Sequence, residues 1–208
     1  LMWDNYYDKV MEVIPDLTSP FAESHSYYLL VEYKDNDLVS GAERFESALF
    51  EQLEVGLLTD ALIAQSNQDA ATFWQIRDGI GELFQVLGPV SNQDISLPIV
   101  EIGGFAVDMD RRLKEKYENI NVLLWGHIGD NNLHVCAYTG LVEDKVRINR
   151  DIMLMIGEYG GAITAEHGVG VLKREFLSLS RSDSEIALMR TIKLAMDPKN
   201  ILNPGRVI

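Results

Sequence analysis

The sequence lacks the marks of secreted, membrane-spanning and nucleic-acid-binding proteins. It contains a single cysteine, Cys136, which excludes an internal disulfide framework and favours a reducing compartment. Its longest apolar runs, such as the one within residues 121–125, are far shorter than the ~18 residues that a membrane span requires. Basic residues number 18 against 32 acidic ones, and the net charge of −14 argues against a nucleic-acid partner, since phosphate contacts need a basic surface.

The sequence also shows no charged segment followed by an apolar stretch at its start, so no secretory signal is expected. We therefore expect a cytoplasmic protein or, in a eukaryote, one of the mitochondrial matrix. With 208 residues, of which 47% are hydrophobic and 24% charged, the composition is that of a soluble globular protein. One domain over residues 1–208 can bury a substantial core.

Hydrophobic periodicity and capping signals predict an alternation of helices and strands. Helices are expected over residues 1–14, 40–55, 67–87, 99–117 and 142–159, and from the capping box of Ser182 and Glu185 to Pro198. Strands are expected over residues 26–33, 57–64, 121–127 and 133–138, with a short one after residues 160–161; residues 88–98 are irregular or a short strand. This order predicts an α+β fold, with a ferredoxin-like antiparallel sheet, helices on one face and a long helical insertion.

Three of the four histidines lie in two glycine-bracketed segments. The first runs Gly-His-Ile-Gly-Asp-Asn-Asn-Leu-His over residues 126–134. If Asp130 and Asn131 form a two-residue hairpin turn, His127 lies directly opposite His134, with their Cβ atoms roughly 5 Å apart. Two imidazoles at that separation can bind one ion.

The second segment, residues 160–170, adds a carboxylate at Glu166 and an imidazole at His167 between flexible glycines. Two histidines and one carboxylate form a ligand set for Zn²⁺ or a similar divalent ion with an open coordination position. The alternative is that these are hydrogen-bonded structural histidines of a hairpin, and spacing alone leaves it open.

Three motifs extend the pattern: residues 126–134, the run Gly-Gly-x-Ile-x-x-Glu-His-Gly-Val-Gly at 160–170, and Asp-Pro-Lys-Asn-Ile-Leu-Asn-Pro-Gly-Arg at 197–206. Weaker matches are Phe-Trp-Gln-Ile-Arg at 73–77 and Asp-Ile-Ser-Leu-Pro at 94–98. With these motifs in this order, the chain resembles the C-terminal domain of the FAD-linked oxidases. That family includes D-2-hydroxyglutarate dehydrogenase, D-lactate dehydrogenase and the flavin subunit of glycolate oxidase.

The resemblance implies a flavin-dependent oxidation of a D-2-hydroxy acid to the 2-oxo acid, with hydride passing to N5 of FAD. It implies that His127, His134 and Glu166 bind a divalent metal, expected to be zinc, that holds the substrate. His167 is then the general base for the substrate hydroxyl, and Arg77 binds the substrate carboxylate through its guanidinium group.

The resemblance places most of the FAD-binding residues on a separate domain, and the sequence contains no glycine-rich phosphate-binding loop. The chain is therefore expected to be one part of a longer protein or a separately encoded half, with the FAD-binding domain as its partner and no turnover alone. Asn203 is expected to contact the cofactor, and Lys173 to have a structural role. A homodimer is compatible with the sequence.

Two other functions fit part of this pattern. A metal-binding, ferredoxin-like regulatory or interaction module without redox activity would use the three ligands and leave His167 and Arg77 without a role. A metal-dependent hydrolase would use Glu166 or His167 to activate water on the same ion, and it would turn over without flavin.

Three positions depart from members that resemble D-2-hydroxyglutarate dehydrogenase. Those members have a lysine where this chain has Asn92, a threonine at the position of Gly81 and an asparagine at that of Cys136. Each difference removes a polar group that could hold a dicarboxylate. We therefore predict a 2-hydroxy acid other than 2-hydroxyglutarate, or a different mode of binding.

Replacing Asn92 by lysine should shift the substrate preference of the flavin-loaded protein toward 2-hydroxyglutarate, because the added ammonium group can pair with a second carboxylate. The measurement is kcat/KM over a panel of 2-hydroxy acids. An unchanged ranking of substrates would contradict this hypothesis.

Overall fold

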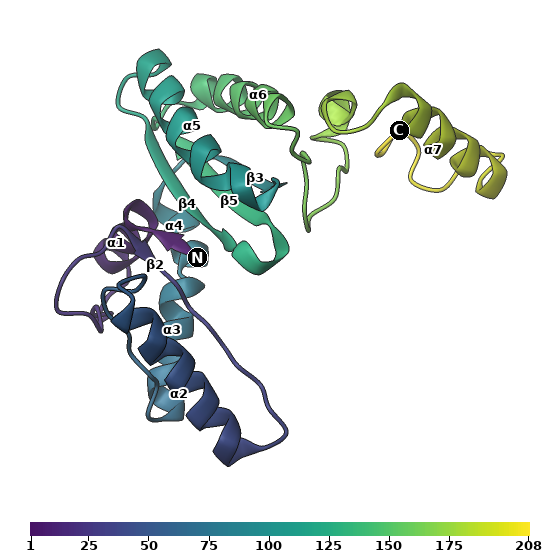
Figure 1. Cartoon of the computed structure of the whole chain (residues 1–208). Helices are drawn as coiled ribbons and strands as arrows, with labels where there is room; N and C mark the ends of the chain where they lie inside the picture. Colours follow the sequence, from purple (N-terminus) through teal and green to yellow (C-terminus); the bar gives the residue numbers. More distant parts are fainter.

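The computed structural model describes the backbone of residues 1–208 and all side chains except those at positions 38 and 39. One antiparallel sheet, in the order β2-β1-β4-β5-β3, forms the centre of the molecule (Figure 1). Its strands are β1 (Met2–Trp3), β2 (Tyr27–Tyr28), β3 (Ser91–Ser96), β4 (Asn121–His127) and β5 (Asn132–Tyr138). The α-helices are α1 (Asp4–Val13), α2 (Leu38–Glu54), α3 (Asn67–Arg77), α4 (Ile80–Val86), α5 (Ile102–Lys116), α6 (Val142–Glu158) and α7 (Asp183–Met196), and the 3-10 helices are η1 (Ile99–Glu101), η2 (Ile128–Asp130) and η3 (Arg174–Leu179).

The predicted α+β fold with an antiparallel sheet is confirmed, and its ferredoxin-like unit runs from β3 to the bridge between Ser96 and Ala162. Within it, β3-α5-β4 and β5-α6 place β5 between β4 and β3, which is the split βαβ arrangement. The unit therefore starts at residues 91–96, which the sequence left undecided.

The two strands predicted in the first third of the chain are mostly wrong. Only Tyr27–Tyr28 forms a strand within residues 26–33, and residues 57–64 contain none. The reason lies at the end of α2, where the backbone N–H groups of Leu57 and Leu58 both donate to the carbonyl of Gln52. An apolar run becomes a strand only where a neighbouring strand pairs with it.

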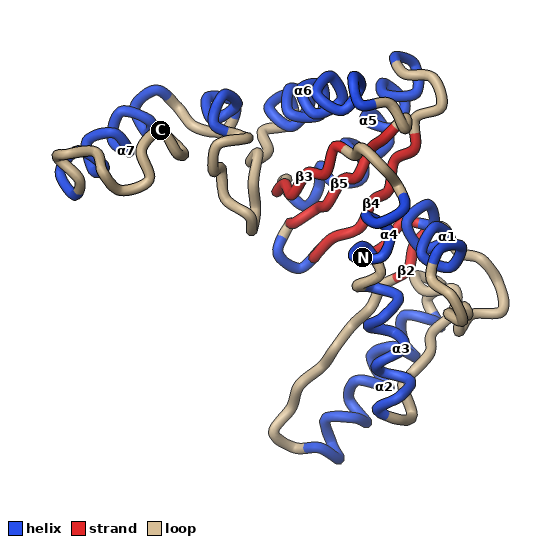
Figure 2. Tube along the Cα trace, turned by 180° about the vertical axis from the view of Figure 1, so that it is seen from behind, coloured by secondary structure: helices blue, strands red, loops and turns tan.

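Helices cover both faces of the sheet, so the prediction of helices on one face is wrong. Alternate residues of β4 point to opposite sides: Val122 and Leu124 pack with α5 and α6, whereas Leu123 and Trp125 pack with α1, α3 and α4. Both views show α5 and α6 on one side and α1 and α4 on the other (Figures 1 and 2). Two separate apolar cores result, one on each face.

The predicted helix over residues 67–87 is interrupted, and the interruption places Arg77. Helix α3 ends at Arg77 and α4 begins at Ile80. A Cβ atom on Gly79 would lie 2.9 Å from side-chain atoms of Val10 and Ile14, so only glycine allows this close approach to α1. The Tyr6 hydroxyl of α1 donates to the carbonyl oxygen of Arg77 at 2.8 Å.

Helices α2 and α7 project from the sheet at opposite ends of the molecule (Figure 1). The predicted capping box at the start of α7 is present, with Ser182 and Glu185 each accepting from the other's backbone N–H. Helix α7 leaves several apolar side chains exposed: Leu188, Ile192, Leu194 and Met196. In the described part of the chain, no helix combines the length and the apolar character needed to cross a membrane.

Gly126 should be the more sensitive of two glycines in the hairpin that carries His127. A Cβ atom there would lie 2.2 Å from the backbone oxygen of Asn132, whereas one on Gly129 meets nothing within 4 Å. Overpacking of this kind costs roughly 1–3 kcal/mol, so Gly126→Ala should lower Tm by about 2–12 °C. Gly129→Ala is the matched control and should leave Tm almost unchanged in thermal unfolding; equal effects would contradict the hairpin geometry.

Candidate metal and substrate site

The hairpin β4–β5 has a different register from the one predicted. Its connection comprises residues 128–131, with Asn131 at φ 57°, so His127 pairs with Asn132 and His134 with Trp125. The predicted direct opposition of His127 and His134 is therefore wrong. Because the register differs by two residues, both side chains keep the same face of the sheet, and their ring centroids lie 5.7 Å apart as diagonal neighbours.

Glu166 joins the two histidines from the loop that follows α6. Its Oε1 lies 3.7 Å from Nε2 of His127 and its Oε2 lies 3.7 Å from Nε2 of His134. One ligand atom from each of the three residues falls within 4.8 Å of the others. The structure thus brings together the three side chains that the resemblance assigned to a metal.

Arg77 lies beside this cluster at the end of α3, and 7% of its surface is exposed. Its Nη2 is 3.0 Å from Nε2 of His127. A guanidinium group can only donate, so the His127 nitrogen must accept, which puts the proton of a neutral His127 ring on Nδ1. Asp78 lies 3.7 Å from the other guanidinium nitrogen and is mostly exposed.

His167 follows Glu166 and lies against the same cluster. Its ring stacks on that of His134 with 6.0 Å between centroids, and 60% of its side chain is exposed. Asn203 is exposed in the loop after α7, with φ 46°. Among the interactions described for residues 1–208, none joins Asn203 to the histidines, so five of the six predicted site residues come together and Asn203 does not.

Sequence analysis did not identify Asp94 of β3 as a site residue. Its side chain is 0% exposed, and Oδ2 accepts from the backbone N–H groups of Ala165, Glu166 and His167 at 3.1, 2.8 and 2.8 Å. Burial by itself would raise the pKa of this carboxyl, but the three N–H donors outweigh it and hold the pKa below its ordinary value. The motif Asp-Ile-Ser-Leu-Pro marked the position without indicating this role.

Lys173 ties the same loop to the sheet. Its Nζ donates to the carbonyl oxygens of Asp94 at 2.8 Å and of Ile163 at 2.7 Å. These two carbonyls belong to β3 and to the segment that precedes Glu166, so the ammonium group holds the two together. The predicted structural role of Lys173 agrees with these contacts.

His134 is the most buried of the three cluster histidines, with 10% of its side chain exposed. Its ring stacks on Trp125 at 5.3 Å between centroids. Burial lowers its pKa to about 4, against the opposing effect of Asp94 and Glu166. The ring is therefore neutral at physiological pH, which is the form that binds metals.

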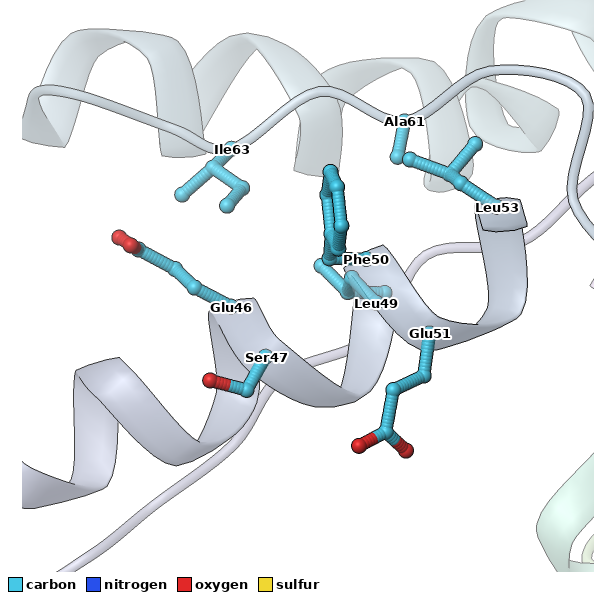
Figure 3. A pocket seen from close by; sticks show the side chains of 8 residues that line it. All are labelled: Glu46, Ser47, Leu49, Phe50, Glu51, Leu53, Ala61 and Ile63. Atoms are coloured by element: carbon cyan, nitrogen blue, oxygen red, sulfur yellow. The ribbon is translucent and has the colours of Figure 1, made fainter.

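A separate cavity lies against the exposed helix α2 (Figure 3). It has a volume of about 520 Å³, and apolar side chains form most of its wall, among them Phe50, Leu53 and Ile63. Its ionisable groups are Glu46 and Glu51, which point away from each other in Figure 3. This groove offers no arrangement of acid, base or ligand comparable to the histidine cluster.

The cluster combines three chemical capacities within a few ångströms. Two imidazole nitrogens and one carboxylate can bind a divalent cation and leave coordination positions open. The guanidinium of Arg77 can bind a carboxylate by two hydrogen bonds. The exposed imidazole of His167 can act as a proton acceptor. Together they suit a small acid that carries a hydroxyl group.

Comparisons with known proteins agree with this chemistry. The family described as FAD linked oxidases, C-terminal domain, matches residues 1–207. D-2-hydroxyglutarate dehydrogenase, mitochondrial, of Arabidopsis thaliana is 37% identical over 207 residues, which cover 99% of this chain and 36% of that protein. The D-2-hydroxyglutarate dehydrogenases of Xanthomonas citri pv. viticola and Stutzerimonas stutzeri are 35% and 34% identical, over 91% and 92% of this chain and 41% and 42% of their own lengths. The chain spans about two fifths of the length of these relatives.

In metal-free protein, His134 should titrate near pH 4 rather than near 6.5. The unfolded chain takes up this proton at about pH 6.5 and the folded chain at about pH 4, so the stabilisation is complete above about pH 6.5 and is lost as the pH falls toward 4. The loss amounts to about 3 kcal/mol at most. NMR titration in the presence of a chelator, and unfolding curves of the native protein and His134→Gln at several pH values, measure it; an ordinary pKa for His134 would contradict the burial of its ring.

Proposed function

The chain belongs to the family of C-terminal domains of FAD-linked oxidases, and from this premise we propose that it binds the metal and the substrate of a flavin-dependent 2-hydroxy-acid dehydrogenase. The reaction is the oxidation of a D-2-hydroxy acid to the 2-oxo acid. The observation that carries the proposal is the convergence of His127, His134 and Glu166, with Arg77 and His167 beside them. The relatives named as D-2-hydroxyglutarate dehydrogenases support this class of substrate.

The donor set fits a divalent metal, and zinc suits two imidazoles and a carboxylate best. Nε2 of His127, Nε2 of His134 and a carboxylate oxygen of Glu166 would hold the ion. A bound divalent ion would lower the pKa of a substrate hydroxyl that coordinates it. The lowered pKa of His134 favours this role because the neutral ring needs no deprotonation before it binds.

The Arg77 guanidinium has two competing partners, Nε2 of His127 and the substrate carboxylate. This guanidinium occupies Nε2 of His127, the nitrogen that the ion needs, and a cation repels it. A bound ion would displace Arg77 from His127 and make its guanidinium available for the substrate carboxylate. Two hydrogen bonds from Arg77 would then hold this carboxylate and orient the hydroxyl carbon.

His167 takes the hydroxyl proton. Its Nδ1 lies 4.0 Å from Oδ2 of Asp94, which leaves Nε2 as the nitrogen that accepts the proton from the substrate. FAD, when bound, supplies the acceptor for the hydride that leaves the α-carbon. An interaction module would leave both Arg77 and His167 without a role beside the ligands.

The FAD-binding domain is the partner that this function requires. The exposed apolar side chains of α7 and the following loop, including Leu194, Met196 and Ile201, provide a surface of the kind that packs against another domain. Asn203 lies in the same loop, and its contact with the flavin stays a prediction. Formation of a homodimer also stays a prediction. The mitochondrial matrix in a eukaryote, or the cytoplasm in a bacterium, is the compartment that we propose.

Substrate choice involves β3 and β5 beside the cluster. Asn92 pairs with Cys136, two residues along both strands from the pair of Asp94 and His134. Cys136 is fully buried, so it offers no polar group to a second substrate carboxylate. This agrees with a substrate other than 2-hydroxyglutarate or with a different mode of binding.

Variants of the flavin-loaded protein separate the metal ligands from the base. His127→Ala/His134→Ala should lose the metal and the activity together. His167→Asn should keep the metal and lose activity by roughly 10²–10⁴-fold, because a general base contributes about that much. Metal content by elemental analysis and kcat with a 2-hydroxy acid are the measurements.

His25→Asn is the control, since His25 lies apart from the cluster with its Nδ1 3.2 Å from the Thr59 hydroxyl. It should keep both metal and activity. Stoichiometric metal in the double variant would exclude the ligand set, and full activity in His167→Asn would exclude the base.

A further inference from the structure

The two carboxylate oxygens of Asp94 have different surroundings. Oδ2 accepts three backbone N–H groups of the loop and lies 3.3 Å from the Thr164 hydroxyl. Oδ1 is buried and has no hydrogen-bond partner in the described part of the chain. Nδ1 of His134 lies 3.8 Å from it. A buried carboxylate oxygen without a donor is costly, and this ring nitrogen is positioned to supply one.

We propose that Asp94 is a positioning residue that keeps the proton of His134 on Nδ1 and thereby leaves the lone pair of Nε2 facing Glu166. The consequence for the ion rests on the function proposed above. Asp94 lies directly opposite His134 across β3 and β5, so the sheet register itself sets this contact.

The chemistry of the two groups determines the tautomer. A neutral imidazole has one donor and one acceptor nitrogen, and an ionised carboxylate only accepts. With the proton on Nδ1, a movement of roughly 1 Å forms a charge-assisted hydrogen bond to Oδ1. With the proton on Nε2, the ring could donate to Oε2 of Glu166 at 3.7 Å, but the lone pair of Nδ1 would then face the buried Oδ1 of Asp94. Glu166 is 49% exposed and can bind water instead, whereas the fully buried Oδ1 has no other donor among the described residues, so the proton on Nδ1 is favoured.

His127 has the same tautomer, but here a cation next to Nε2 fixes it rather than an anion next to Nδ1. The Arg77 guanidinium donates to Nε2 of His127, which must therefore carry the lone pair. An anion next to Nδ1 of His134 and a cation next to Nε2 of His127 thus leave both Nε2 atoms unprotonated, and each lies 3.7 Å from an oxygen of Glu166. The two rings are prepared for one ion before it arrives.

The same carboxylate also holds the loop that carries the other two groups. Oδ2 fixes the backbone of Glu166 and His167, so one side chain orients a carboxylate ligand, a histidine ligand and the base. Asp94, Glu166 and His167 also have ligand atoms within 4.8 Å of one another. An ion bound through Oδ2 would have to displace three N–H donors, which favours the positioning role over direct coordination.

Asp94→Asn separates the two roles. The amide oxygen can keep the three N–H groups, while the amide nitrogen replaces Oδ1 and donates to Nδ1 of His134. This donation forces the proton of the ring onto Nε2. Asp94→Ala removes both roles, and Asp144→Asn is the control, because Asp144 is a buried carboxylate that accepts from Thr139 instead.

The experiment reads the tautomer of His134 directly, in metal-free protein at pH 8 labelled with ¹⁵N at histidine. Long-range ¹H–¹⁵N spectra should show Nδ1–H in the native protein and in Asp144→Asn, and Nε2–H in Asp94→Asn. Zinc affinity, measured by competition with a chelator, should fall about 10–100-fold in Asp94→Asn. Hydrogen exchange at residues 165–167 should stay slow in Asp94→Asn and become fast in Asp94→Ala.

An Nε2–H tautomer in the native protein would overturn the proposal, as would an unchanged tautomer in Asp94→Asn. The zinc measurement tests the proposed metal site independently of the tautomer. If the tautomer changes as expected and native protein does not bind zinc, Asp94 positions His134 and the proposed metal site is wrong. If zinc binds and the tautomer is Nε2–H, the metal site stands and the role of Asp94 is wrong.

Discussion

The site depends on one carboxylate that accepts three successive backbone N–H groups. Asp94 lies on the sheet, and the groups that it binds lie in the loop carrying Glu166 and His167. A loop between elements has no ladder of its own, so this contact supplies the hydrogen bonds that its backbone needs. Lys173 closes the same junction from the other side by donating to a carbonyl on each segment.

The charged groups of the site compensate one another in the absence of an ion. Glu166 and Asp94 place negative charge around His134, and the Arg77 guanidinium supplies a positive charge close to the position that an ion would take. A divalent cation at the proposed site would repel this guanidinium from His127. We propose that its release would couple metal binding to binding of the substrate carboxylate, because the same guanidinium cannot contact His127 and the substrate together.

Sequence patterns predicted most helices and the two histidine strands, because their periodicity and capping are local. They left the strand at residues 91–96 undecided, because its pairing with β5 depends on contacts distant in sequence. They also assigned a strand to residues 57–64, which have no pairing partner. The predicted hairpin register was wrong, but the prediction that His127 and His134 lie close together was not affected. A slip of two residues leaves both side chains on the same face of the sheet. Asp94 could not be found from spacing, since its role exists only after the loop has folded onto the sheet.

The most direct test of this account is to locate the ion in crystals of zinc-loaded protein by anomalous diffraction at the zinc edge. The account predicts a single strong peak about 2.0–2.2 Å from Nε2 of His127, Nε2 of His134 and an oxygen of Glu166, with the Arg77 guanidinium withdrawn from His127. A peak bonded to Asp94, or none at this cluster when the protein is saturated with zinc, would contradict it.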